Sequence, residues 1–523
     1  MRKPIIMAMA ACLCVTFSMA QTRVFKQVAE EMSSDMEVIM QDGAVMGYVV
    51  LTKLEKANAD SFNYKLSLMD ENLNDIGEIN QKDVNMSLMG VAFEQDVLCL
   101  SYLKSSIDGT TFKNKKEFKD AKDDTKDVIT NQFITLDGKV INTHNFNISL
   151  AVDYAMGAKR KVVASAQLKN GGQVKNIPGK GFCFLYGDKD KSEVIAYNTK
   201  GEVLWKKEVD RYNHYSVITT DKVVYILGKN NSYSNPYGGY ELDRFSVADG
   251  KKGTKYELVD KDDNVLRVLN FEKNPVTGKP YIAGSIINRR FKGAFESGKA
   301  YNKGMYKGVF SLTLNGVEKG DIKENYSYWS DGEFKPDFST RGYMQDRKAF
   351  SILEAASQDS AGNVYFAGTT IHKKFRIGAV VSSTLLLPTF FFPIVIMGSV
   401  GTHKYRLGEG IIIKQTSKGS VFTDQELEKN KSRYYQARVP VVMYDSPTEY
   451  YNLYSPAAKS DVFIYRDDKS YNIYSLSKKQ ISRRIPYSIG KSRIRVTGAK
   501  EGHIMILENN TKEKYTKLSI EPI

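Results

Sequence analysis

A short pattern that recurs along the chain constrains the fold more than any other feature. In each copy, an aromatic residue has a glycine three positions before it and another three positions after it, except that Lys222 replaces the first glycine of one copy. The four copies are Gly181-Phe184-Gly187, Lys222-Tyr225-Gly228, Gly278-Tyr281-Gly284 and Gly362-Tyr365-Gly368. Each copy is followed by a second apolar run and a turn, around Gly201, Gly250, Gly316 and Gly419. Pairs such as Asp249-Gly250 favour hairpin turns because both residues must tolerate positive φ. A repeated pair of hairpins predicts a fold assembled from equivalent units.

The spacing and composition of these units predict a β-propeller. Helical periodicity is nearly absent after Asp35, and runs rich in Val, Ile, Tyr and Phe alternate with turns. The aromatic markers Phe184 and Tyr225 are 41 residues apart, and Phe463 and Met505 are 42 apart, which is close to one four-stranded blade. Seven full units and a partial eighth can be counted. The chain is therefore predicted to be all-β, with one propeller of about seven to eight blades over residues 21–523.

One copy of the repeat is similar to a known pattern. Residues 359–369, DSAGNVYFAGT, resemble the D-x-x-G-N-x-Y-x-x-G-x-T repeat of bacterial β-propeller families. The other copies keep mainly the aromatic residue and the glycine. The whole chain also resembles exported proteins of unknown function from Bacteroidetes-type bacteria. This resemblance implies a cell-envelope location in a Gram-negative bacterium, and it implies no activity.

The last unit is one strand short of a complete blade. No strand-like run follows Ile520, and residues Thr22 to Val28 could supply the missing outer strand. This arrangement would join the two ends of the chain and close the ring. The alternative is a frayed N-terminal segment that pairs with nothing.

The first twenty residues have the pattern of a secretory signal. Arg2 and Lys3 precede an apolar run, and Ser18-Met19-Ala20 precede Gln21. Cleavage would therefore leave Gln21 as the first residue of the mature protein, in the periplasm or at the outer membrane. Two cysteines, Cys99 and Cys183, would remain, and each lies in a different apolar hairpin. They are predicted to be buried free thiols.

Two insertions interrupt the repeat. Residues 113–127 contain eleven charged residues of both signs in fifteen positions, which predicts a solvated loop. Residues 377–401 contain no charged residue, although Lys373, Lys374 and Arg406 are close to their ends. Their length is that of a membrane-spanning helix. However, Pro388 and Pro393 would each cost a helix about 3 kcal/mol, and the flanking runs look like neighbouring strands of one blade.

The uncharged insertion is therefore predicted to be an apolar hairpin. Leaving its six largest side chains in water would cost roughly 1.5 to 3 kcal/mol each. Three covers are possible: the protein's own fold, a lipid bilayer whose headgroups meet the flanking cations, or a partner subunit. The predicted membrane or partner contacts are Leu385, Leu386, Leu387, Phe390, Phe391 and Phe392.

Two loops rich in tyrosine could form a platform that stacks on sugars or peptides. The alternative for these rings is ordinary packing between blades. The candidate residues are Tyr233, Tyr237, Tyr240, Tyr326, Tyr328 and Trp329. A basic stretch from Lys478 to Arg495 could bind an anionic partner, or it could protect an exposed edge strand.

No catalytic, cofactor or metal motif is present in the sequence. The five histidines are scattered, and no nucleophile elbow, phosphate loop or dinucleotide fingerprint occurs. The favoured hypothesis is a non-catalytic binding or assembly scaffold of the cell envelope with no cofactor. Its expected partner is an envelope protein or a glycan, a membrane surface is a further candidate, and nucleic acid is not expected. The alternative is a propeller hydrolase or lyase that acts on glycans or peptides from the central funnel.

Overall fold

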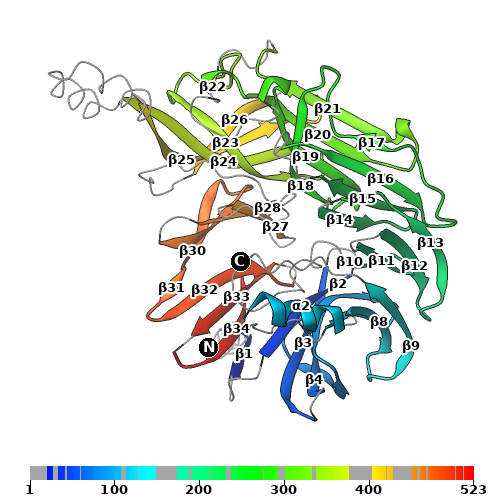
Figure 1. Ribbon diagram of the computed structural model, residues 1–523. Coiled ribbons are helices and arrows are strands. Elements are labelled where there is room, and N and C mark those ends of the chain that lie inside the picture. The colour runs from blue at the N-terminus through cyan, green and yellow to red at the C-terminus, as the bar shows by residue number, and fades with distance from the viewer. Residues whose placement is uncertain are drawn as a thin grey trace, which may run out of the picture.

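The structure is a computed structural model of the chain. It describes residues 21–523 except for 27–32, 42–43, 59–60, 106, 108–113, 125–126, 149–172, 188–190, 213, 231–236, 275, 292–299, 301, 332–336, 376–402, 420, 428–449, 456–459, 467–468, 501 and 511. The predicted export signal, residues 1–20, lies outside the described residues. Eight antiparallel sheets follow one another along the chain and form a ring (Figure 1).

Each sheet is one blade, and the strands of a blade follow in chain order. Blade 1 contains β2 (Ser33–Gln41), β3 (Ala44–Lys56), β4 (Phe62–Asp70) and β5 (Asp75–Asp83). Blade 2 contains β6 (Met86–Glu94), β7 (Val97–Lys104), β8 (Asp127–Thr135) and β9 (Val140–Ile148). Blade 3 contains β10 (Gln173–Ile177), β11 (Gly181–Gly187), β12 (Ser192–Asn198) and β13 (Val203–Glu208). Blade 4 contains β14 (His214–Thr219), β15 (Val223–Lys229), β16 (Tyr240–Ser246) and β17 (Tyr256–Glu257).

The second half of the ring repeats this order with two additional short strands. Blade 5 contains β18 (Val265–Lys273), β19 (Pro280–Ile287), β20 (Tyr306–Leu314) and β21 (Ile322–Tyr328). Blade 6 contains β22 (Tyr343–Met344), β23 (Ala349–Gln358), β24 (Val364–Phe375), β25 (His403–Gln415) and β26 (Val421–Leu427). Blade 7 contains β27 (Tyr450–Ser455), β28 (Ser460–Arg466), β29 (Ser470–Ser475) and β30 (Gln480–Pro486). Blade 8 contains β31 (Ser488–Ile489), β32 (Ser492–Gly498), β33 (His503–Asn510), β34 (Tyr515–Pro522) and β1 (Gln21–Lys26).

The hydrophobic core is divided among the interfaces between blades. Among the described residues, nine buried clusters lie between neighbouring blades, and one of them joins blade 8 to blade 1 through residues such as Met505 and Tyr48. The first long strands of the blades contact one another in series from β2 to β27, which identifies them as the inner strands. The predicted all-β propeller is therefore confirmed, with eight blades.

The ring closes through the two ends of the chain. Strand β1 pairs antiparallel with β34, from Gln21 opposite Ile520 to Lys26 opposite Tyr515. This pairing makes β1 the outer strand of blade 8, as predicted for Thr22 to Val28, although residues 27 and 28 lie outside the described residues. Strand β1, from the other end of the chain, hydrogen-bonds to the outer edge of β34, whose backbone groups would otherwise be unpaired.

The structure explains why the sequence repeat has its second glycine. The aromatic markers lie on the second long strands of blades 3 to 6, and in blades 5 and 6 the glycine three positions later faces a bulge in the inner strand. A Cβ at Gly284 would lie 1.9 Å from the carbonyl oxygen of Arg267, and one at Gly368 would lie 2.0 Å from that of Ile352. A larger residue would therefore force the two strands apart.

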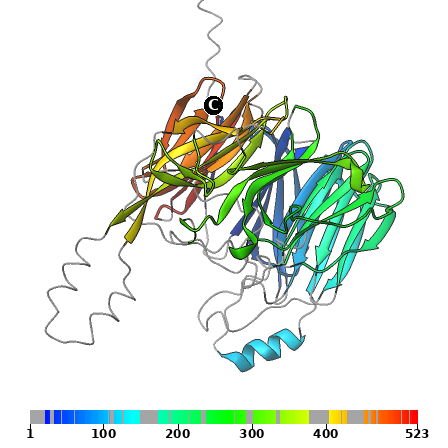
Figure 2. The ribbon, with the colours of Figure 1, turned by 90° about the horizontal axis from the view of Figure 1, so that it is seen from above.

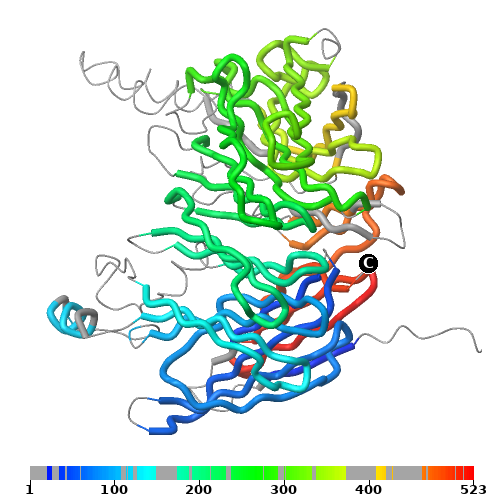
Figure 3. The backbone as a smooth tube through the Cα atoms, turned by 90° about the vertical axis from the view of Figure 1, so that its right-hand side faces the viewer, coloured from blue at the N-terminus to red at the C-terminus, as the bar shows by residue number. Residues whose placement is uncertain are grey.

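The two faces of the ring carry different connections. One face, here called the tight-turn face, joins strand one to two and three to four, through short links such as 95–96 and 199–202. The opposite face, here called the insertion face, joins strand two to three and each blade to the next. Its links include 105–126, 149–172, 288–305, 376–402 and 428–449. Figures 2 and 3 show the helix α2 and the end of the β24–β25 hairpin on this same side.

The charged insertion is not wholly a loop. Lys115–Asp124 form helix α2, so the sequence prediction of a solvated loop is wrong over these ten residues. Asn114 caps the helix by accepting a hydrogen bond of 2.9 Å from the Glu117 N–H. Phe118 is buried in the cluster between blades 2 and 3, and Ala121 packs against the same cluster one turn later. Two apolar residues at a spacing of three attach the helix to the ring.

The prediction that both cysteines are buried free thiols is confirmed. Cys99 on β7 and Cys183 on β11 are free and completely buried. Burial raises the pKa of the Cys183 thiol to about 12, and it raises that of Cys99 as well. Thiols in this environment act as small apolar side chains.

Candidate functional site on the insertion face

The most prominent element of the insertion face is a two-stranded arm made of β24 and β25. These strands contain 12 and 13 residues and pair from Val364 opposite Gln415 to Phe375 opposite His403 (Figure 2). At the base of the arm, His372 Nε2 lies 3.1 Å from Glu409 Oε2, and the Thr370 hydroxyl donates to the same carboxylate oxygen at 3.1 Å. These contacts join the two strands of the arm where it leaves the blade.

The arm determines where the apolar insertion is attached. The predicted contact residues Leu385 to Leu387 and Phe390 to Phe392 lie outside the described residues. The residues on either side of the insertion are described, and Phe375 pairs directly with His403. The chain therefore enters and leaves the insertion at one point, on one side of the ring. The prediction that the flanking runs are neighbouring strands of one blade is confirmed.

Cations and aromatic rings meet where blades 4 and 5 reach the insertion face. Lys229 ends β15 with no exposed surface, and its Nζ lies 4.9 Å from the centre of the Tyr240 ring. Burial lowers the pKa of Lys229 to about 8, and the positive charge of Arg267 adds to this effect. Arg267 donates a hydrogen bond of 2.5 Å to the Tyr306 hydroxyl and lies 5.8 Å from the Tyr237 ring.

Sequence reasoning singled out Tyr237 and Tyr240 of this group but neither of the two cations. Lys229 follows Gly228, the second glycine of one repeat, and it ends the apolar run VVYIL. The signal in the sequence for this cation was a charged residue at the end of a run that is otherwise apolar. Its neighbour Arg267 comes from the next blade, and a pairing across blades is not visible in the local sequence.

The candidate aromatic platform is divided among several interfaces. Tyr237, Tyr240 and Trp329 are each at most 2% exposed, and their rings pack inside the ring of blades. Tyr326 and Tyr328 are half-buried and stack with their centres 6.5 Å apart. The Tyr328 hydroxyl donates to Asp260 at 2.8 Å. Tyr233 lies outside the described residues. The structure therefore leaves only the Tyr326–Tyr328 pair with rings that are partly accessible to solvent.

The inner strands bring charged residues toward the ring axis. Lys175 on β10 keeps exposed surface although protein atoms surround it, as expected for a side chain beside the axis. Desolvation lowers the pKa of Lys175, Glu37 of β2 opposes this change, and Lys273 of β18 adds to it. These three residues come from blades 1, 3 and 5. The axis therefore carries mixed charge from blades that are not neighbours.

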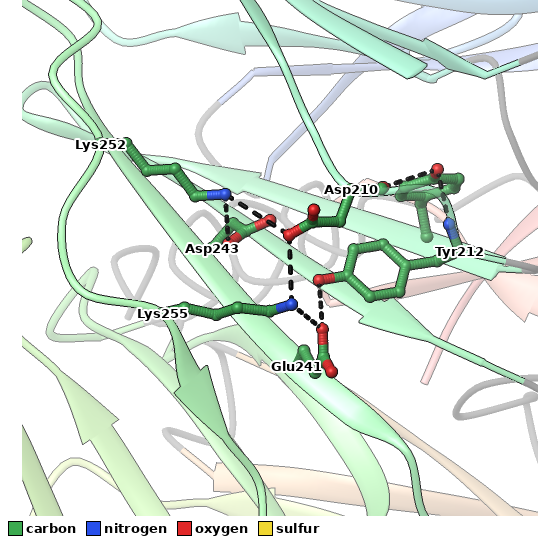
Figure 4. A network of polar contacts seen from close by, with 7 residues as sticks. Asp210, Tyr212, Glu241, Asp243, Lys252 and Lys255 are labelled. Atoms are coloured by element: carbon green, nitrogen blue, oxygen red, sulfur yellow. Dashed lines mark hydrogen bonds and ion pairs between the residues drawn. The ribbon is translucent and has the colours of Figure 1, made fainter. Parts of the chain in front are cut away.

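An ionic network lies in the wall between blades 3 and 4, and most of its charged members are partly exposed to solvent (Figure 4). Its members are Asp210, Tyr212, Glu241, Asp243, Lys252 and Lys255. Lys252 Nζ lies 3.0 Å from Asp243 Oδ1, Lys255 Nζ lies 3.1 Å from Asp210 Oδ2, and the Tyr212 hydroxyl donates to Glu241 at 2.7 Å. Desolvation raises the pKa of Asp243, which has no exposed surface, and Lys252 opposes this change.

This network is not part of a central funnel. Asp243 lies on β16, the third strand of blade 4, so two strands of the blade separate it from the ring axis. Across the part of the chain that the structure describes, no group of three or more His, Cys, Asp or Glu side chains could hold a metal ion. In the same residues, no helix is long and apolar enough to cross a bilayer.

The chain is similar in part to a protein family without an assigned function. Residues 1–233 match a family of unknown function (DUF6770). No curated protein matches the chain.

Several solved propellers are similar to the chain in structure. The Dos1 propeller is 8% identical, covers 96% of this chain and 95% of its own, and has a TM-score of 0.43. The WD40 domain of SCAP from fission yeast is 8% identical, with coverage of 95% and 97% and a TM-score of 0.38. An ulvan lyase of polysaccharide lyase family PL25 is 8% identical, with coverage of 83% and 91% and a TM-score of 0.34. At these identities and scores, the similarities carry no argument about function.

Proposed function

We propose that this protein is a non-catalytic binding or assembly scaffold of the bacterial cell envelope. In this proposal, the insertion face is its binding face, and the apolar segment 377–401 attaches that face to a membrane surface. The partner recognised there is an envelope protein or glycan.

The pairing of Phe375 with His403 carries the proposal. It brings both ends of an uncharged segment to the tip of one arm, so the segment can enter a bilayer from one side without dividing the blade. The register also places the basic residues Lys374 and Lys404 opposite each other next to the segment. Cations at this position would meet anionic headgroups while the apolar residues enter the acyl region.

The asymmetry of the ring supports a scaffold. The longest connections lie on one face, whereas the links on the opposite face are at most nine residues long, as in 247–255. Loops held by a rigid framework are the usual location of binding residues. The raised pKa of Asp243 belongs to an acid in the blade wall that is paired with Lys252, and not to an acid in a funnel.

Flotation with anionic liposomes tests membrane attachment. The chain from Gln21 is compared with a variant in which residues 377–401 are replaced by a short Gly-Ser turn. A matched control replaces 149–172, a connection of similar length on the same face. We expect the chain and the control to float and the 377–401 variant to remain at the bottom of the gradient with an unchanged melting temperature. Flotation of that variant, or failure of the unmodified chain to float, would refute membrane attachment through residues 377–401. Unfolding of the variant would assign the segment to the protein core.

Export is tested separately because it does not depend on lipid binding. The full chain is expressed in a Gram-negative host, and the N-terminal peptide of the product is identified by mass spectrometry. We expect it to begin at Gln21, the first residue of β1, and to occur in the envelope fraction. A cytoplasmic product that retains Met1 would contradict the envelope location.

A further inference from the structure

The outer strand of blade 7 borders a basic hollow near the tight-turn face. The hollow has a volume of about 500 Å³ and contains three basic side chains and no acidic one. Its lining residues are Tyr474, Lys479, Gln480, Ile481, Ser482, Arg483 and Arg484. Residues 469–500 contain nine Lys and Arg and no Asp or Glu, whereas most of the chain mixes both signs. The fold places only part of this stretch at the hollow, because Arg493 and Arg495 lie on β32 in blade 8.

A β-bulge shapes the hollow. The pairing between β29 and β30 shifts at Ile473 and Tyr474, so Ser482 is an additional residue and its hydroxyl donates to the Ile473 carbonyl at 3.1 Å. Arg483 turns toward blade 8, where it donates to the Pro522 carbonyl at 3.2 Å and pairs with Glu521. Arg484 is the next residue and is exposed on the strand. Bulges of this kind reorient side chains.

Lys479 occupies a backbone position that favours glycine. Its φ is +54°, in the left-handed region, and it ends the turn before β30. The corresponding turns of blades 2, 3 and 6 have Gly138, Gly201 and Gly419 with positive φ. A lysine at this position is strained relative to glycine, and such strain often marks a residue retained for its side chain.

Protection of an edge strand does not account for all these features. Strand β30 is the last strand of its sheet, so its outer backbone groups are not part of a ladder. However, the bulge and Pro486 already disfavour pairing with another strand. Edge protection also requires neither a hollow nor a strained lysine.

We propose that the hollow bordered by Lys479 and Arg484 binds an anionic polysaccharide through its carboxylate or sulfate groups. Guanidinium groups recognise planar carboxylates and tetrahedral sulfates through paired N–H donors, and lysine adds a mobile charge. The cations extend over six residues of turn and strand, a length of roughly 16 to 20 Å, which suits several charges along one polymer.

The geometry favours a glycan over other polyanions. An acidic peptide would add to the edge of β30 as a strand, and the bulge and Pro486 interrupt the straight ladder that this requires. A lipid surface would meet the face that carries the β24–β25 arm, whereas the hollow opens at the tight-turn end of β30. The proposal does not depend on the membrane attachment described above.

Binding of defined oligosaccharides tests the proposal. Isothermal titration measures polygalacturonate and sulfated dextran oligosaccharides, with neutral dextran and polyglutamate as comparisons. The double variant Lys479→Gln/Arg484→Gln is compared with Lys200→Gln/Lys207→Gln, which removes two exposed lysines from blade 3. We expect the first variant to weaken binding by roughly ten- to a hundredfold and the second by less than about twofold. The oligosaccharide that binds more tightly identifies carboxylate or sulfate as the preferred group.

Three results would overturn the proposal. Equal weakening in both double variants would mean that only net charge matters. Polyglutamate binding as tightly as the oligosaccharides would assign the hollow to an acidic protein. No binding of the unmodified protein to either charged oligosaccharide would leave edge protection as the role of these cations.

A second variant distinguishes binding from folding. Lys479→Gly removes the charge and also relieves the left-handed strain. We expect it to weaken oligosaccharide binding while it raises the melting temperature. A variant with a raised melting temperature and unchanged binding would exclude Lys479 from the site, and a lowered melting temperature would show that the lysine is retained for stability.

Discussion

The tight-turn face and the insertion face are built on the same eight blades but differ in what their residues do. On the tight-turn face, buried polar groups join neighbouring turns: the Arg244 guanidinium, with no exposed surface, donates to the carbonyl oxygens of Glu318 at 2.6 Å and Thr254 at 2.7 Å. On the insertion face, Arg289 is 63% exposed at its side chain. The difference indicates that buried side-chain hydrogen bonds between turns stabilise the ring at the tight-turn face, whereas the exposed Arg289 contributes little to its stability.

The largest loss of stability is expected where the ring closes. Removing residues 21–26 deletes β1, which is the partner of β34, and uncovers part of the cluster between blades 8 and 1. With six residues unpaired, we expect a loss of about 5 kcal/mol or more in the free energy of unfolding, together with self-association through the new edge. Thermal unfolding and size-exclusion chromatography measure both effects.

The control for ring closure is the variant that replaces 149–172 on the insertion face. It should unfold within a few degrees of the unmodified protein, because it removes a connection and no described strand. If this variant and the deletion of residues 21–26 lowered stability equally, the two faces would not differ in their contribution to stability.

The next largest effect is expected at Arg244. Arg244→Met keeps much of the side-chain volume but leaves buried carbonyl oxygens of two neighbouring turns without their donor. We expect a loss of about 3 to 5 kcal/mol, which is typical of breaking a buried charged interaction. Arg289→Met is the matched control and should change stability by at most about 0.5 kcal/mol. Chemical denaturation of both variants measures the difference, and similar values would contradict the comparison.

A smaller and more local effect is expected at helix α2. Phe118 attaches this insertion-face element to the ring, so Phe118→Ala should release the helix while the ring remains folded. We expect faster cleavage by trypsin within Lys115–Asp124 and a global melting temperature lowered by no more than about 2 °C, because local units can open independently. Lys116→Ala, at an exposed position of the helix, is the control. A large global loss would show that α2 is part of the common core.

The sequence predicted the regular part of the ring better than its binding face. Each blade repeats a local sequence pattern of turn glycines and alternating apolar residues. The architecture and the closure of the ring by β1 could therefore be predicted without knowledge of contacts between distant residues. Gly201, Gly250 and Gly419 have the positive φ that their turns require. Gly316 does not, and the 3₁₀ helix η3 (Lys319–Asp321) follows it within the same connection.

The insertion face was harder to predict because its contacts join distant residues. Helix α2 was missed because eleven charges conceal the single apolar pair, Phe118 and Ala121, that attaches it. The group around Lys229 depends on Arg267 from the next blade, and a second short 3₁₀ helix, η2 (Arg289–Phe291), follows β19 there. Local patterns determine strands and turns, whereas side chains that meet across blades are determined by the closed ring.

The smallest expected effect concerns two aspartates whose pKa values move in opposite directions. Burial raises the pKa of Asp243 in the wall, so the folded protein binds a proton there at a pH at which the unfolded chain has lost it. Stability should therefore fall as the pH rises from about 4 toward the raised value of Asp243. At the tight-turn face, a hydrogen bond from the Lys251 N–H lowers the pKa of Asp249, and its contribution should be lost as the pH falls below about 4. Asp243→Asn and Asp249→Asn should each remove one of these opposite slopes from melting temperatures measured between pH 3 and 8. The same slope change in both variants would mean that buried and surface carboxylates of the ring do not differ in this way.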